Sequence, residues 1–202
     1  MERKMKDTYA TVIVDLMSSE EEILKKIEKS ARNGVTKAQR SGLRVEEAGL
    51  SAKEYSMYQQ TMIDGGSEPE TIEELKKEMI VMFVCLKEDK IIAEASLKIE
   101  DGRITLHTNS SLKEYQHLQP NNLLYWECIK WAKAQGYKEL DLGGFQDGIM
   151  SKHLKGINDF KKKWGQIRYY EKDYPFFRAL GRKLIKKNKM LWEINRVIRG
   201  RK

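Results

Sequence analysis

The sequence predicts an α+β domain with a mostly antiparallel sheet and helices on both faces of that sheet. Strand and helix patterns follow one another in the order β-α-α-β-α-α-β-β-β-α-β-α-β-α, without an internal repeat or a low-complexity linker. Three strand patterns in the middle are joined only by short turns, at 88–90 and at Asp101-Gly102. Both turns favour hairpins, so these strands form an antiparallel meander that the helices have to cover.

The first helical region begins after a β-branched strand at 11–16. Ser18 and Ser19, followed by acidic residues at 20–22, provide an N-cap and an acidic first turn. The helix pattern continues past Ile27 towards Arg32. We expect Asn33-Gly34 to break or kink it, leaving a second helical piece at 35–40.

The remaining elements follow from alternation, helical spacing and turn residues. Thr71 is a helix cap, Pro120 starts a strong apolar helix after a loop, and Gly136 ends that helix. We expect strands at 43–47, 80–86, 91–99, 103–109, 139–142 and 166–170, and helices at 52–62, 68–78, 123–134 and 152–164.

Composition is that of an ordinary globular protein of 202 residues, with 40% hydrophobic and 34% charged residues. No apolar run is long enough to span a bilayer and no signal peptide precedes the first strand, so we expect a cytoplasmic protein. Cys85 and Cys128 fit buried free thiols in a reducing compartment. The histidines, at positions 107, 117 and 153, lack metal-ligand spacing, so no structural metal is expected.

The net charge of +8 comes from the end of the chain. Residues 178–202 hold ten Lys/Arg and one Glu, whereas the other 177 residues hold 28 basic and 29 acidic groups. We therefore divide the chain into a domain at 1–174 and a basic amphipathic helix at 175–202. Such a helix can lie on the anionic inner face of a membrane, bind the tRNA backbone, or pack on its own domain.

The stretch 137–165 carries the sharpest chemical signal. A strand leads into a glycine-punctuated loop and then a helix, on which apolar residues form one stripe: Leu154, Ile157, Phe160 and Trp164. Lys162 and Lys163 point away from this stripe, but Lys161 falls within it, roughly 40° from Ile157. A lysine in that place snorkels outward, pairs with another group, or serves as a partly desolvated cation.

Two segments carry a family resemblance: NSSLKEYQHLQPNNLLYWECIKWAKAQGYKELDLGG at 109–144 and GINDFKKKWG at 156–165. They resemble the Fem family of peptidoglycan interpeptide-bridge aminoacyltransferases, which is built on the GNAT acyltransferase fold. The N-terminal segment from TVIVDL to EEAG is similar to the start of the second GNAT-like unit of those proteins. The resemblance spans 10–171, and its most specific parts are Asp141-Leu142-Gly143-Gly144 and Phe160-Lys161.

The resemblance implies a GNAT-like fold and transfer of an aminoacyl group from aminoacyl-tRNA to an amine of a peptidoglycan precursor, without a cofactor. It also implies that Phe160 and Lys161 lie at the acyl-transfer centre. Attack on an aminoacyl ester builds negative charge on the carbonyl oxygen, which a cation in a partly dry site stabilises. Phe160 would keep water from the ester.

Other candidates each have two interpretations. Asp141 is a general base for the attacking ammonium or a cap for the following loop. Gly143 and Gly144 allow a tight turn or a close approach to substrate. Tyr125 is a candidate substrate contact, although it and Trp126 fit the core better.

Two further groups of polar residues are candidates for substrate contacts. Lys37 and Arg40 form a basic cluster with Arg32 and Arg44, which is a solvated face or a surface for substrate phosphates. Asp147 fits only a minor contact. No Ser-His-Asp or Cys-His order suggests a covalent nucleophile.

The chain departs from the family in having room for only one GNAT-like unit, which suggests a homodimer, a smaller acceptor or another substrate. An alternative function is an acyl-CoA-dependent N-acyltransferase using acetyl-CoA. The chain lacks a Gln/Arg-x-x-Gly-x-Gly/Ala pyrophosphate loop, with partial likenesses at 32–34 and 146–148. A further alternative is a non-catalytic module that binds tRNA or a membrane.

Overall fold

The computed structural model describes residues 4–100, 102–145 and 152–175. Its strands form one seven-stranded sheet in the order β2-β3-β4-β5-β6-β1-β7. Only β5 and β6 pair in parallel; the other neighbours are antiparallel. The strands are β1 (Lys4–Asp15), β2 (Leu43–Ala48), β3 (Met79–Lys87), β4 (Lys90–Glu100), β5 (Arg103–Ser111), β6 (Glu139–Phe145) and β7 (Gln166–Pro175).

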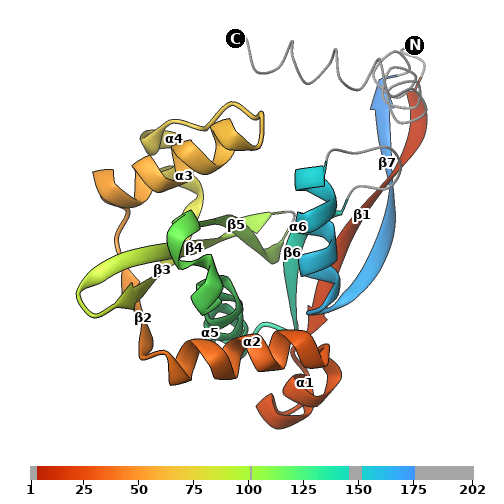
Figure 1. Cartoon of the computed structure of the whole chain (residues 1–202). Coiled ribbons are helices and arrows are strands. Elements are labelled where there is room, and N and C mark those ends of the chain that lie inside the picture. The colour runs from red at the N-terminus through yellow and green to blue at the C-terminus, as the bar shows by residue number, and fades with distance from the viewer. Residues whose placement is uncertain (1–3, 101, 146–151, 176–202) are drawn as a thin grey trace.

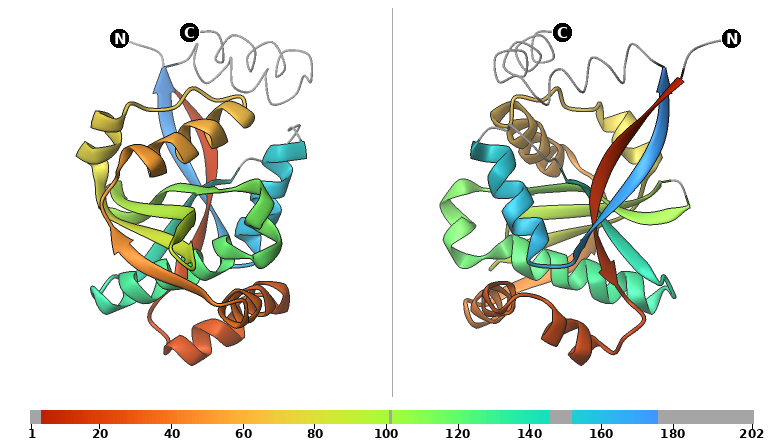
Figure 2. Two further views of the ribbon diagram at one scale, coloured as in Figure 1. Left: turned by 60° about the vertical axis from the view of Figure 1, so that its left-hand side comes forward. Right: turned by 90° about the vertical axis from the view of Figure 1, so that its right-hand side faces the viewer.

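Helices cover both faces of this sheet, as Figures 1 and 2 show. They are α1 (Glu20–Lys26), α2 (Lys29–Arg40), α3 (Ala52–Asp64), α4 (Ile72–Glu78), the 3₁₀ helix η1 (Lys113–Leu118), α5 (Pro120–Ala134) and α6 (Lys152–Lys162). The main core lies between the sheet and α5 with α2, and a smaller cluster around Tyr58, Leu75 and Met82 lies under α3 and α4. The predicted α+β architecture with a mostly antiparallel sheet is therefore confirmed.

The break between α1 and α2 lies earlier than the sequence predicts. The chain is extended at Ile27 and Glu28, and α2 then runs uninterrupted through Asn33 and Gly34. Gly34 serves packing instead, because a Cβ there would lie 2.5 Å from the Asn122 side chain of α5. The glycine thus lets two helices approach closely, and the prediction of a break at this position was wrong.

Strands β1 and β7 are longer than the sequence predicts. β1 pairs with β6 from Ala10 to Asp15, whereas within the described residues its first half pairs with β7 alone. The two strands form a ribbon that extends beyond the rest of the sheet (Figure 1). Its outer part, KMKDT on β1 and EKDYP on β7, is charged and polar, and it shows no apolar alternation from which a strand could be predicted.

The other observed element boundaries differ from the predicted ones by a few residues, and the predicted helix caps are confirmed. Ser19 and Thr71 both cap their helices through capping boxes, and Gly136 follows α5 at a φ of +83°. Cys85 and Cys128 are buried and unbonded to each other. None of the described helices is long and apolar enough to cross a membrane. The predicted helix at 175–202 lies outside the described residues except for Pro175, which ends β7, and so does Asp147.

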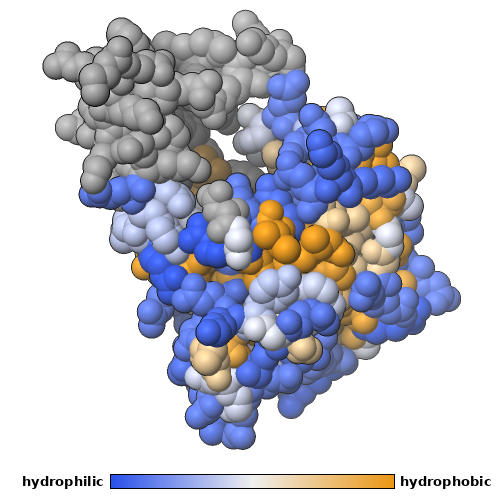
Figure 3. Space-filling model, turned by 180° about the vertical axis from the view of Figure 1, so that it is seen from behind, coloured by the Kyte–Doolittle hydropathy of each residue, from blue (hydrophilic) through white to orange (hydrophobic). Residues whose placement is uncertain are grey.

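The cover over the sheet is incomplete. Ile80 and Ile99, on the adjacent strands β3 and β4, are about half exposed. The face seen from behind carries an apolar patch between hydrophilic side chains (Figure 3). Some apolar surface of the described residues is therefore exposed.

Candidate active site

The candidate site lies at the carboxyl ends of the parallel strands β5 and β6. Within the described residues their register consists of Ile104 opposite Leu140 and Thr105 opposite Asp141. Beyond these pairs the carboxyl ends of the two strands are no longer joined by a ladder. In α/β sheets, ligands bind where the carboxyl ends of neighbouring parallel strands separate. The Asp-Leu-Gly-Gly sequence of β6 occupies this position.

Lys161 reaches this strand end from α6. Its Nζ donates a hydrogen bond to the carbonyl oxygen of Gly144 at 3.1 Å. Burial lowers the pKa of Lys161 to about 8, and the nearby Asp141 carboxylate opposes that shift. Of the three possibilities for a lysine in the apolar stripe, the structure favours the partly desolvated cation, held by a backbone carbonyl and an acidic neighbour.

The apolar stripe itself differs in one member from the prediction. Ile157 is 37% exposed, and the buried position on this face of α6 belongs to Asn158 instead. Leu154 and Phe160 are half-buried, and Trp164 is buried just beyond the end of the helix. Placing Ile157 in the stripe was therefore wrong, because α6 packs over a narrower arc than its apolar residues span.

Asp141 lies buried in β6, with 4% of its surface exposed. Its Oδ1 accepts a hydrogen bond from the backbone N–H of Gly143 at 2.8 Å, so it does orient the glycine turn. Burial raises the pKa of Asp141; the Gly143 amide, Arg103, Thr11 and Lys161 act against this shift. A carboxyl group with a raised pKa is a stronger base than an exposed aspartate. The interpretation of Asp141 as a general base therefore stays open as well.

Aromatic rings form the wall beside Lys161. The Tyr125 ring of α5 meets the Phe160 ring edge-on at 4.9 Å between centroids and lies 5.5 Å from the Trp164 ring. Tyr125 and Trp126 are both buried, as the core interpretation predicts. Because Phe160 is packed on Tyr125, the part of α6 that carries Lys161 is fixed against α5.

The two glycines of the β6 sequence play different structural roles. Gly143 has a φ of +78°, and a Cβ at this position would lie 3.5 Å from Lys161 Nζ and 3.6 Å from the Leu106 carbonyl oxygen. Gly144 has open space where a Cβ would be. Gly143 thus makes the turn that brings the strand end to Lys161, whereas Gly144 contributes its carbonyl.

Lys37 and Arg40 lie apart from these residues. They line a surface hollow of about 330 Å³ on α2 together with Asn33, Thr36 and Ser41. No residue of β6 or α6 lines this hollow, and α2 ends next to β2, at the far edge of the sheet (Figure 1). The structure therefore does not bring the predicted phosphate contacts together with Lys161.

Sequence reasoning missed Arg103, the first residue of β5. Its charge and that of Asp141 act on each other across the parallel pair of strands. The two residues are 38 positions apart, and only the β5–β6 register makes them neighbours. No local pattern could have indicated this.

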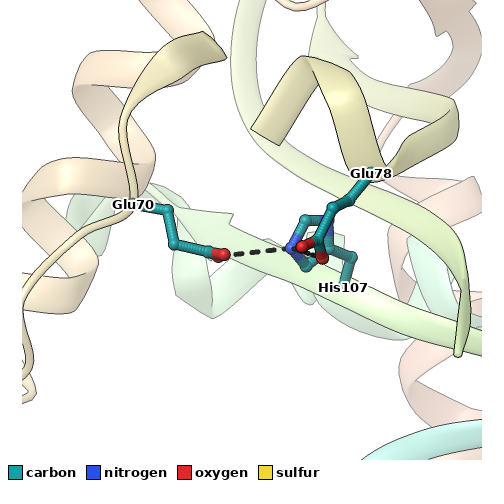
Figure 4. A group of neighbouring side chains, drawn as sticks. All are labelled: Glu70, Glu78 and His107. Atoms are coloured by element: carbon teal, nitrogen blue, oxygen red, sulfur yellow. Dashed lines mark hydrogen bonds and ion pairs between the residues drawn. The ribbon is translucent and has the colours of Figure 1, made fainter. Parts of the chain in front are cut away.

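A second polar cluster joins the sheet to α4. His107 of β5 lies with its Nε2 3.2 Å from a Glu70 carboxylate oxygen and 3.8 Å from one of Glu78 (Figure 4). Lys98 Nζ contacts the same Glu78 oxygen at 2.8 Å. His107 Nδ1 is buried without a partner in the described part of the chain, whereas metal-bound histidines normally donate from their second nitrogen. The cluster therefore fits a polar tie between α4 and the sheet, with Lys98 and Glu78 as its ion pair, better than a metal centre.

This tie predicts a pH-dependent stability. Burial and the Lys98 charge lower the pKa of His107 below its usual 6.5, while Glu70 and Glu78 oppose the shift. In the unfolded chain His107 takes up a proton below about pH 6.5, which the folded state resists, so stability falls as the pH drops through this range. His107→Gln should flatten this part of a plot of Tm against pH. His117→Gln, at an exposed position, should leave the slope unchanged; equal slopes in all three proteins would contradict the prediction.

Comparisons with known proteins agree with this architecture. A family model described as Acetyltransferase (GNAT) domain matches residues 70–162. Among solved structures, FemX superposes with a TM-score of 0.66 at 16% identity, covering 88% of this chain and 64% of the FemX chain. A search of curated proteins found no match.

Two further structures have a similar fold. L-PGS from Bacillus licheniformis has a TM-score of 0.58 at 16% identity, covering 96% of this chain and 67% of its own. The C-terminal domain of a putative lysylphosphatidylglycerol synthetase from Agrobacterium fabrum has a TM-score of 0.56 at 15% identity, covering 91% and 65%.

These findings confirm the predicted GNAT fold and its likeness to the Fem type of GNAT unit. The chain spans about two thirds of the length of each of these structures. The domain match supports an acyltransferase as the class of enzyme.

Proposed function

We propose that this protein is an aminoacyltransferase that moves an amino acid from aminoacyl-tRNA to an amine of a peptidoglycan precursor, as in cell-wall bridge formation. The observation that carries the proposal is the half-buried Lys161 ammonium at the end of β6, held by the Gly144 carbonyl and faced by Asp141. FemX, with the highest TM-score of the three structures compared above, supports this choice within the acyltransferases.

Asp141 and Lys161 have different roles in the proposed reaction. The precursor amine attacks the carbonyl carbon of the aminoacyl ester, a C–N bond forms, and the C–O bond to the tRNA ribose breaks. Asp141 takes the proton released by the amine and returns it to the ribose oxygen that leaves. Lys161 stabilises the negative charge on the carbonyl oxygen in the intermediate. With a pKa of about 8, Lys161 is largely protonated at neutral pH.

The surrounding residues complete the proposed site. Phe160 and Tyr125 limit the access of water to the ester, which would otherwise hydrolyse. Gly143 and Gly144 let the substrate approach the strand end. Lys37 and Arg40 would contact phosphates of the tRNA or of a nucleotide- or lipid-linked precursor away from the reacting atoms.

A second candidate is an acyl-CoA-dependent N-acyltransferase, because the matching family model is that of an acetyltransferase domain. Its donor would deliver an acetyl thioester to the same strand end, and Lys161 would act on the same kind of oxyanion. A homodimer and contact with a membrane through residues 175–202 belong to the proposal as partners, and the same set of experiments tests them.

The test compares donors. Purified protein is incubated with precursor and either charged tRNAs carrying labelled amino acids or labelled acetyl-CoA, and product is separated by chromatography. We expect label from tRNA, and a weaker apparent affinity for tRNA in the double variant Lys37→Ala/Arg40→Ala. Transfer only from acetyl-CoA would replace the proposal with the second candidate.

If neither donor works, while tRNA or anionic vesicles still bind, the protein is a binding module. Sedimentation of the same samples gives the oligomeric state.

A further inference from the structure

Arg103, at the start of β5, contacts an aromatic ring of the β1–β7 ribbon, and a second ring of the ribbon supports the first. Its guanidinium carbon lies 4.6 Å from the centroid of the Tyr170 ring, which is the distance of a cation–π contact. Tyr170 stacks on Tyr9 at 5.2 Å with 21° between the ring planes, and the two residues are directly paired across the ribbon. This clamp, formed by Tyr9 and Tyr170, fixes the cation beside β6.

The positive charge of Arg103 favours the ionised form of Asp141. Burial alone would lower the pKa of Arg103, but the Tyr9 hydroxyl, Tyr170 and the Asp141 carboxylate raise it overall. Its Nε is buried and has no hydrogen-bond partner in the described part of the chain. An unsatisfied buried N–H costs free energy, so stability alone does not account for an arginine here.

Another carboxylate nearby is already neutralised. Glu139, two residues before Asp141 on β6, accepts hydrogen bonds from both terminal nitrogens of Arg168, each at 2.6 Å. Such a bidentate pair is the strong form of an arginine–carboxylate contact. Arg168 is thus the main partner of Glu139, to which Arg103 adds only a smaller charge effect. Of these two arginines, Arg103 is the one that acts on Asp141.

Asp141 has a cation near it on each of two neighbouring elements. Thr105 of β5 is paired with Asp141, and Arg103 lies two residues earlier on the same face of that strand. The charges of Arg103 and of Lys161 on α6 favour the ionised carboxylate, as do Thr11 of β1 and the Gly143 amide. Burial works against the ionised carboxylate, and these four groups work for it. Lys161 in turn depends on Asp141, the charge that opposes the effect of its own burial.

We propose that Arg103 is a positioning residue: held by Tyr9 and Tyr170, it keeps the Asp141 carboxylate charged and fixed on the Gly143 amide, at the strand end that Lys161 reaches. The role of this pair in catalysis rests on the proposed function; the effect of Arg103 on Asp141 does not. Arg103 thereby connects the β1–β7 ribbon to the reacting residues and determines the lowest pH at which the site is assembled.

The experiment measures this effect directly. The Asp141 carboxyl carbon is titrated by NMR in the wild type, Arg103→Gln, Arg103→Lys and Lys25→Gln, and the rate of transfer is recorded against pH in the same proteins. An arginine beside an aspartate lowers the pKa of the aspartate by about 1 to 3 units, so Arg103→Gln should raise the Asp141 midpoint by about 1 unit or more. The acidic limb of the rate profile should move with it, whereas the alkaline limb, set by Lys161, should stay.

Two variants separate charge from structure. Arg103→Lys keeps the charge and should restore most of the wild-type midpoint. Lys25→Gln removes an equal charge next to Glu21, on α1, and should change neither readout. If Arg103→Gln does not fold, Tyr170→Leu, which removes the ring contact but no charge, takes its place and should raise the midpoint by a smaller amount.

An Asp141 midpoint that stays at the wild-type value in a folded variant would overturn the proposal. So would a shifted midpoint with an unmoved acidic limb. If the wild type transfers no acyl group from any donor, the proposed function fails, and the NMR titration still decides whether Arg103 controls Asp141.

Discussion

Lys161→Ala is expected to lower kcat/KM for acyl transfer by about 10²- to 10³-fold, the usual cost of losing one group that stabilises a developing oxyanion. The ammonium is held by the Gly144 carbonyl in a half-buried site, where its charge is screened less than on the open surface. Activity of the wild type should also fall as the pH rises through about 8, because Lys161 then loses its proton. Steady-state rates with whichever donor supports transfer measure both effects.

Lys162→Ala is the matched control. Lys162 is the next residue on α6 and is exposed; its Nζ pairs with Asp159 at 3.2 Å and lies 5.8 Å from the centroid of the Phe145 ring. Such surface pairs contribute little, so this variant should keep wild-type activity. Similar losses in both variants would show that α6 tolerates no truncation and would remove the special role of Lys161.

As the pH rises, the stability of the folded protein should change in the opposite direction to its activity. The pKa of Lys161 in the fold lies below its usual 10.5, so between about pH 8 and 10.5 the unfolded chain binds the proton that the folded one has released. Wild-type stability from this group therefore rises over that range, and at neutral pH the buried charge is a cost. Lys161→Met should be inactive but at least as stable as the wild type, as judged by Tm. A clearly lower Tm would indicate a structural lysine.

The sequence predicted the parts of the fold that depend on local pattern. Alternation and turn residues located the β3–β4–β5 meander, and capping residues located the starts of α1 and α4. Gly34 was misinterpreted because a glycine inside a helix pattern has two explanations, a break or a close contact, and only the position of Asn122 decides between them.

In the candidate site, too, a local sequence pattern indicates some residues, whereas others are brought together only by the tertiary structure. Lys161 could be singled out because helical periodicity alone places it among apolar neighbours. Arg103 and His107 could not, since one depends on the parallel register of β5 with β6 and the other on how α4 packs over β5. Lys37 and Arg40 were grouped by charge, which carries no information on their distance from the strand end.

Gly165→Ala is expected to destabilise the folded protein strongly. A Cβ at this position would lie 2.2 Å from the carbonyl oxygen and 2.7 Å from the carbonyl carbon of Ile13, and 3.2 Å from the nitrogen of Val14. These are backbone atoms in β1, which cannot rotate away as a side chain would. Forcing extra volume into packed backbone costs about 3 kcal/mol, which corresponds to a Tm lower by roughly 10 °C for a chain of this size.

Gly49→Ala provides the comparison, because no atom lies within 4 Å of the Cβ it would add. Its Tm should stay within about 2 °C of the wild type, as for most substitutions at open positions. Gly165 follows directly on Trp164, which packs against Tyr125, so displacing it should also shift α6 relative to β6. Gly165→Ala should therefore lose activity together with stability, whereas Lys161→Ala loses activity alone. A Gly165→Ala protein as stable as Gly49→Ala would mean that β1 and the start of β7 can separate freely at this point, and the tight junction between α6 and the sheet would then not be what fixes Lys161.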